Sequence, residues 1–123
     1  VALPASAAAR SEMFRMLQGV FARFDVMLSP VTTAPPLSVD TDPHGHITIS
    51  GVDCGTIRGA WYPFTFPMNL TGHPALAQPA GLSCAGTPIG VQLCGAWHSE
   101  ATLLATAAAL ESRLPKFQRP AVP

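Results

Sequence analysis

Apolar side chains recur at three- and four-residue steps between Ser6 and Phe24, and polar side chains fill the positions between them. This spacing places the apolar residues on one face of a helix, so an amphipathic helix is predicted with Ser6 as its N-cap. The apolar run 26–29 that follows, stopped by Pro30, predicts a short buried strand. The apolar residues of the helix are Met13, Phe14, Met16, Leu17, Val20, Phe21 and Phe24.

Two segments with different patterns come next. Residues 30–45 hold four prolines together with Thr, Ser and Asp, which predicts a loop. Residues 46–54 carry β-branched side chains around a glycine, which predicts a short strand or an irregular hairpin.

The stretch 56–70 is rich in aromatic residues, and its apolar positions predict a helix that Pro63 and Pro67 bend or break. We expect this helix to end near Asn69. Gly72 can adopt the left-handed conformation that ends a helix, and Pro74 prevents its continuation. The chain is therefore expected to pass from helix through a turn into a strand.

Two β-like runs, 75–78 and 88–94, flank a segment in which Gly86 can supply a turn. Ser99 is a predicted N-cap for a final helix that Pro115 ends. Residues 115–123 are expected to form a tail without regular structure. The mixture of helices and strands indicates an α/β or α+β class. The face of the last helix that should be buried holds Leu103, Ala107, Leu110 and Leu114.

The composition suggests a part of a larger molecule. A chain of 123 residues is about one domain, so residues 1–123 are taken as a single domain. Only 11% of its residues are charged and 48% are hydrophobic, which leaves little polar surface for a freestanding domain. We expect some apolar surface to be covered by another segment, and the isolated chain to self-associate.

Charge and cysteine usage exclude several classes. Seven basic and seven acidic residues cancel without a basic cluster, so the footprint of a nucleic-acid binder is missing. No apolar run is long enough for a membrane span, and the first residues do not resemble a signal peptide. Three unpaired cysteines fit reduced thiols. The expected compartment is the cytoplasm, and no membrane or nucleic-acid partner is expected.

Three local patterns allow a chemical interpretation and a structural one. Asn69 and Thr71 form a glycosylation acceptor, but that needs a secreted context, so a helix-ending turn is favoured. His44 and His46 near Cys54 match no zinc spacing, and a solvated turn is the simpler interpretation. No metal and no cofactor are therefore expected.

A cysteine nucleophile is a further alternative, with Cys84 or Cys94 acting beside His98. The sequence identifies no oxyanion hole for it, and a buried cysteine in a hairpin is favoured.

Several motifs between Phe14 and Glu111 occur together and in order. A Phe-Asp strand runs into Ser-Pro in FDVMLSPVTTAPP, and an aromatic-Pro-x-Asn-x-x-Gly-x-Pro turn lies in FPMNLTGHP. The stretch GTPIGVQ gives a Gly-x-Pro-x-Gly-x-Gln hairpin, and an Ala/Leu-rich helix follows. Together these resemble the C-terminal part of amidase signature enzymes. The resemblance implies a short mixed β-sheet with a hairpin, flanked by helices.

The resemblance also implies an activity and a missing part. Enzymes of that family hydrolyse carboxamide bonds through a Ser–Ser–Lys relay that lies in an earlier segment. The lysine of this chain, Lys116, follows Pro115, and no Gly/Ser-rich run precedes it. No catalytic residue is therefore assigned here, and the chain alone is expected to be inactive. The implied partners are the N-terminal remainder of the same enzyme and a small amide substrate; a non-catalytic assembly module and a small Cys/His hydrolase are the alternatives.

The resemblance further suggests residues for the substrate pocket. The aromatic stretch lies close to the substrate cleft in the family, which makes Trp61, Tyr62 and Asn69 pocket candidates, although core packing suits the aromatic residues equally. The amidotransferase branch of the family carries an acidic residue near the position of Tyr62, so an aromatic residue there implies a less polar substrate. The role of Arg58, a carboxylate ligand or a surface charge, stays open.

Overall fold

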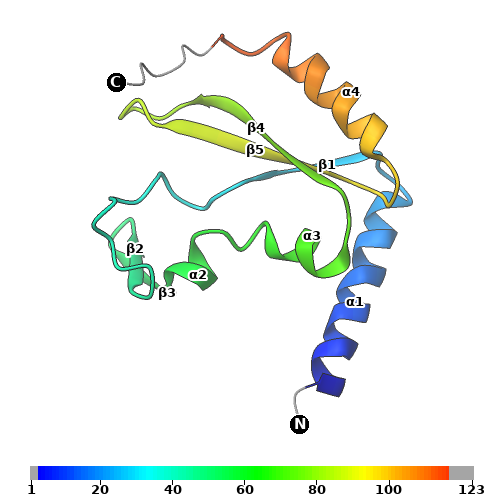
Figure 1. The fold of residues 1–123 in the computed structure, drawn as a ribbon, viewed down its shortest axis with the longest axis horizontal. Coiled ribbons are helices and arrows are strands. Elements are labelled where there is room, and N and C mark those ends of the chain that lie inside the picture. The colour runs from blue at the N-terminus through cyan, green and yellow to red at the C-terminus, as the bar shows by residue number, and fades with distance from the viewer. Residues whose placement is uncertain (1–2, 117–123) are drawn as a thin grey trace.

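The computed structural model describes residues 3–116, and its centre is a three-stranded sheet in the order β1-β5-β4 (Figure 1). Strands β1 (Val26–Pro30) and β4 (Ala75–Leu82) both pair with β5 (Pro88–Gly95). The mixed α and β class is confirmed. The strand pairs are antiparallel, however, and in this respect the expectation of a mixed sheet is wrong.

The β4–β5 connection explains why this pair is antiparallel. Ser83 donates its backbone N–H to the carbonyl of Thr87, and Gly86 donates to the carbonyl of Ser83. Gly86 has a φ of 77°, which a residue without a Cβ adopts at little cost. The predicted turn at Gly86 is confirmed, and a tight turn of this kind can join only antiparallel strands.

Helices cover the sheet on both faces (Figure 1). Helix α4 (Glu100–Glu111) contacts β5 from one side through Leu93, while α1 (Leu3–Phe21) and α3 (Phe66–Thr71) lie on the other side with Cys94. Successive residues of a strand point to opposite faces, so Leu93 and Cys94 belong to two separate apolar clusters. The buried members are Leu93, Leu103 and Ala107 in the first cluster, and Leu17, Met68 and Cys94 in the second.

The first helix differs from its prediction at both ends. It begins at Leu3, so Ser6 lies inside the helix and the prediction that it forms the N-cap is wrong. The alanines around Ser6 have the highest helix propensity, which carries the helix back toward the N-terminus. The helix ends at Phe21, and the predicted face is only partly covered, since Met16 and Phe24 are exposed.

A small second sheet and two short helices lie between β1 and β4. Strands β2 (His46–Ile49) and β3 (Val52–Thr56) form a hairpin with an irregular register, which is one of the two alternatives predicted for this segment. The aromatic stretch forms α2 (Ile57–Ala60) and α3 instead of one helix. A proline cannot donate a helical hydrogen bond, which explains the break at Pro63, whereas Pro67 is tolerated in the first turn of α3.

The ends of the other helices agree with the prediction at one position and differ from it at two. Gly72 ends α3 with a φ of 72°, as predicted. Ser99 precedes α4, but its hydroxyl donates to the carbonyl of Ala96 at 2.7 Å, so the predicted side-chain cap is wrong. The helix ends at Glu111, before a turn to Leu114, rather than at Pro115. Residues 117–123 of the predicted tail lie outside the described residues.

Gly95, where β5 leads toward α4, is predicted to be intolerant of a side chain. A Cβ at this position would overlap the Ser99 hydroxyl and lie 3.2 Å from a Leu103 methyl carbon. Gly95→Ala should lower the free energy of unfolding by about 1–3 kcal/mol, because moving Ser99 breaks its bond to Ala96. Gly19→Ala, in open space on α1, should instead raise it by about 0.5–1 kcal/mol. Urea denaturation of both variants measures the difference; equal stabilities would contradict the close approach.

Candidate functional site

An apolar cavity of about 540 Å³ lies beside the end of β1. One wall is the proline-rich segment that follows the strand, and another is formed by β4 and β5 near their hairpin. Trp61 adds an aromatic surface from the end of α2. The lining consists of residues 30–36, 77–79 and 88–90 together with Trp61.

Hydrogen bonds hold the proline-rich wall against Trp61. The indole N–H donates to the carbonyl of Ala34 at 3.1 Å, and the backbone N–H of Thr33 donates to the carbonyl of Trp61 at 2.8 Å. The N–H of Val31 donates to the carbonyl of Gly90 at 3.2 Å, which extends the β1–β5 pairing into the cavity wall. A segment rich in proline and without regular structure is thus fixed at three points, so the cavity is preformed.

Gln92 connects this wall to the sheet. Its side chain is 5% exposed, and its Nε2 donates to the Ser29 hydroxyl at 3.1 Å and to the carbonyl of Phe64 at 3.0 Å. One amide therefore links β1, β5 and the segment that carries the aromatic residues. Gln92 lies in a run predicted to be a strand, and a polar residue among Ile89, Val91 and Leu93 is the sequence signal for its role.

The three predicted pocket residues do not come together. Trp61 lines the cavity, whereas Tyr62 packs its ring against Trp61 at 5.8 Å and against Phe66 at 5.5 Å between centroids. Asn69 is exposed on α3, and neither it nor Tyr62 is among the lining residues. Arg58 is exposed on α2.

His73 is buried where α3 turns into β4. The Thr71 hydroxyl donates its one hydrogen to the carbonyl of Pro67 at 2.7 Å, so it accepts from Nδ1 of His73 at 2.8 Å. In this arrangement the imidazole carries a proton on Nδ1, and Nε2 is buried without a partner among the described residues. Phe14 and Phe21 of α1 lie 5.4 and 5.2 Å from its ring. Burial lowers the pKa of His73.

Among the described residues no hydrogen bond joins a cysteine to a histidine, and Cys84 and His98 are both exposed. Cys94 is fully buried, and burial raises the pKa of its thiol to about 11, which keeps it protonated. His46 pairs with Asp53 through Nδ1 at 3.0 Å on the exposed β2–β3 hairpin, and this bond lowers the pKa of the Asp53 carboxyl. Within residues 3–116 no three His, Cys, Asp or Glu side chains are grouped so that they could hold a metal ion.

The length and hydropathy of the helices show whether any of them could span a membrane. In the part of the chain that the structure describes, none combines the length and the apolar character needed to cross a bilayer.

Comparisons of the sequence with a family profile and with known proteins both point to amidases and related proteins. The profile of the family described as Amidase matches residues 2–104. The putative amidase AmiA2 of Mycobacterium tuberculosis is 39% identical over 99 residues, which cover 80% of this chain and 19% of that protein. A glutamyl-tRNA(Gln) amidotransferase subunit from Streptococcus pneumoniae is 36% identical over 103 residues, covering 84% of this chain and 19% of that protein.

The fold gives the same result. The crystal structure of a bacterial aryl acylamidase of the amidase signature family superimposes with a TM-score of 0.72 and 31% identity, covering 84% of this chain and 21% of that one. The chain thus spans about a fifth of the length of the proteins that it matches.

The buried His73 should make the stability of the chain depend on pH. In the unfolded chain its pKa returns to the ordinary value near 6.5, so below that pH the unfolded state binds more protons than the folded state. The free energy of unfolding should be level above about pH 7 and fall as the pH drops from about 6.5 toward the lowered pKa of the folded state.

Urea denaturation at a series of pH values measures this slope. His73→Phe should flatten it, whereas His44→Asn, at an exposed position, should leave it unchanged. An equally steep slope in His73→Phe would show that another group is responsible.

Proposed function

The chain belongs to the amidase family, and from this membership we propose that it is the C-terminal part of an enzyme that hydrolyses carboxamide bonds. The proposed nucleophile is a serine of a Ser–Ser–Lys triad in upstream residues. Two observations support this: the match covers most of this chain but about a fifth of its relatives, and Lys116 lies beyond the end of α4. Lys116 lies in a segment without regular structure, whereas a catalytic base must be held in place beside its nucleophile.

The proposed role of the chain is to form one wall of the pocket for the acyl or aryl part of the amide. The cavity beside Trp61 carries this proposal, because its walls are mostly proline and aliphatic side chains. The indole N–H of Trp61 already donates to Ala34, so the ring offers an apolar surface and no free donor. Binding there rests on burial of apolar area, worth about 25 cal/mol per Å².

Tyr62 bears on the choice between amidase and amidotransferase. Its ring is held between Trp61 and Phe66, so the position supplies an aromatic surface where the resemblance would place an acidic residue in the amidotransferase branch. A polar substrate such as glutamine would find no carboxylate here. We therefore propose a substrate of lower polarity, with Tyr62 supporting Trp61 from behind rather than contacting the substrate.

The proposed partner is the upstream part of the same polypeptide. Several large apolar side chains on the sheet and on α4 are exposed, and Leu28, Leu82 and Leu104 are each more than half exposed. A stable domain seldom leaves so much apolar surface in contact with water. The same observation favours one second candidate, a module that assembles with another protein without taking part in catalysis.

Activity measurements on the chain and on the longer polypeptide test the proposal. The longer polypeptide should hydrolyse aryl or aliphatic amides, and the 123-residue chain alone should show no turnover. Turnover by the chain alone that is lost in Cys84→Ala would overturn the upstream nucleophile. Failure of the longer polypeptide to hydrolyse any amide would favour the assembly module.

Trp61 should influence the binding of the substrate more than the chemical step. In the longer polypeptide, Trp61→Ala should raise KM for an aryl amide about tenfold, through a loss of about 1.4 kcal/mol of binding, with little change in kcat. Trp61→Phe, which keeps an aromatic surface, should recover most of this loss. Tyr62→Phe serves as the matched control, and steady-state kinetics separate the two constants. An unchanged KM in Trp61→Ala would remove Trp61 from the pocket.

A further inference from the structure

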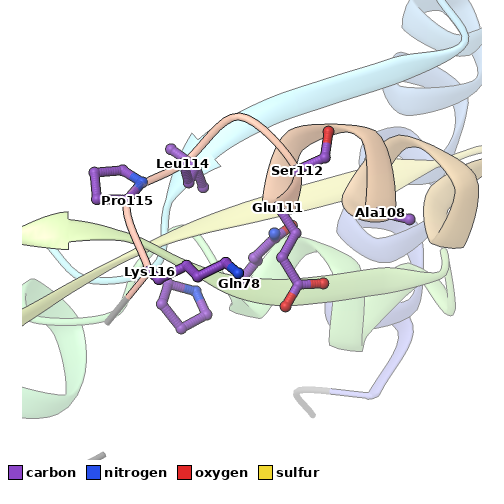
Figure 2. Close-up of a pocket in the computed structure, with 8 residues that line it drawn as sticks. Gln78, Ala108, Glu111, Ser112, Leu114, Pro115 and Lys116 are labelled. Carbon is purple, nitrogen blue, oxygen red and sulfur yellow. The ribbon is translucent and has the colours of Figure 1, made fainter. Parts of the chain in front are cut away.

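A second cavity, of about 580 Å³, lies between the end of α4 and strand β4 (Figure 2). It is on the opposite face of the sheet from α1 and is separate from the cavity beside Trp61, although Gln78 and Pro79 border both. Its apolar walls are Pro79, Ala108, Leu114 and Pro115. Its polar lining consists of Gln78, Glu111, Ser112 and Lys116.

Gln78 is the buried polar group of this cavity. Its side chain is 8% exposed, and its Nε2 donates to the carbonyl of Ala107 on α4 at 3.2 Å. Because a carbonyl cannot donate, the amide orientation is fixed and Oε1 is the remaining acceptor. Oε1 is buried and has no partner among the described residues. A buried acceptor without a donor costs free energy, but Oε1 is closed to solvent, so a ligand N–H group can reach it only when a neighbouring side chain moves aside.

Two opposite charges border the same cavity without pairing. In Figure 2 the Glu111 side chain extends from the last turn of α4, and Lys116 reaches back from the segment after the helix toward Gln78. Neither Glu111 nor Lys116 belongs to an ion pair within residues 3–116. Glu111 lies at the C-terminal end of α4, where the helix dipole also favours a positive charge.

We propose that this cavity is a binding site for a small zwitterion, namely an α-amino acid with an aliphatic side chain. The ammonium group donates to Glu111 and to Oε1 of Gln78. The carboxylate pairs with Lys116, whose flexible side chain moves off Gln78 as the ligand enters. The aliphatic side chain lies against Pro79 and Leu114. Each polar group that is unpaired in the cavity thereby gains a partner of opposite character.

A zwitterion fits better than a ligand with a single charge. An amine without a carboxylate would leave Lys116 unpaired and would be repelled by it, and a carboxylate without an amine would meet Glu111 in the same way. The site shares Gln78 and Pro79 with the cavity beside Trp61, but its two charged residues and Leu114 line this cavity alone, so binding here does not require amide hydrolysis. Its test therefore reads binding alone.

Ligand-observed saturation-transfer NMR on the 123-residue chain, with L-leucine as the probe, tests the site. A ligand of this size should bind with a Kd of about 1 mM. L-leucinamide, which lacks the carboxylate, and 4-methylpentanoate, which lacks the ammonium, should each bind at least about fivefold more weakly. Equal binding of all three compounds would mean apolar association only and would overturn the proposal, as would no binding of leucine.

Variants at the two charges locate the binding. Glu111→Gln and Lys116→Gln are substitutions at exposed positions, and each should weaken leucine binding at least about fivefold. Arg113→Gln, next to the site but outside its lining, and Glu12→Gln on α1 are the matched controls and should bind as the unmodified chain does. Leucine binding that survives both Glu111→Gln and Lys116→Gln would place the ligand elsewhere and refute the assignment. Neither result depends on whether the longer polypeptide has amidase activity.

Discussion

Two consecutive residues of the central strand, Leu93 and Cys94, are both completely buried on opposite faces of the sheet, and the rest of the structure depends on this. Leu93 contacts the helix that follows the strand, and Cys94 lies under the helices that precede it in the sequence. Because β5 also pairs on both edges, every part of the main sheet and its covering helices rests on this strand. Loss of its packing would disrupt both apolar clusters, because each cluster has one of these two residues as a buried member.

The same strand connects the core to the cavity beside Trp61. Gln92 precedes Leu93, and its buried amide links Ser29 to the carbonyl of Phe64. A leucine at this position would leave the Phe64 carbonyl without this donor. The polar residue therefore sets the position of the aromatic segment relative to β1. The proline-rich wall of the cavity has no regular structure, so its position depends on contacts with the sheet and the aromatic segment. The hydrogen bonds of Trp61 and Thr33 supply the contacts with the aromatic segment.

The sequence predicted what local chemistry determines. The turns at Gly72 and Gly86 and the strands on either side of Gly86 follow from residue type and periodicity alone. Of the face predicted to be buried on the last helix, Leu103 and Ala107 are buried, whereas Leu110 and Leu114 are only partly covered. The ends of the helices followed less well, because Ser6 lies in an alanine-rich run and Ser99 bonds to Ala96 instead of capping.

The buried polar residues Gln78 and Gln92 form hydrogen bonds with residues that are far away in the sequence. Gln78 meets a carbonyl 29 residues later, and Gln92 meets a hydroxyl 63 residues earlier, so neither role could be read from spacing. Trp61 was identified as a pocket candidate by resemblance; its contact with the proline-rich segment was not.

We propose that this chain shapes the substrate pocket of an amidase while the nucleophile lies upstream. Labelling of the longer polypeptide with a fluorophosphonate, which forms a covalent bond with an activated serine, tests this claim most directly. Peptide mass spectrometry should find the label on one serine upstream of Val1 and on none of the serines in the 123-residue chain. A stoichiometric label on any serine of this chain, with loss of activity, would contradict the account.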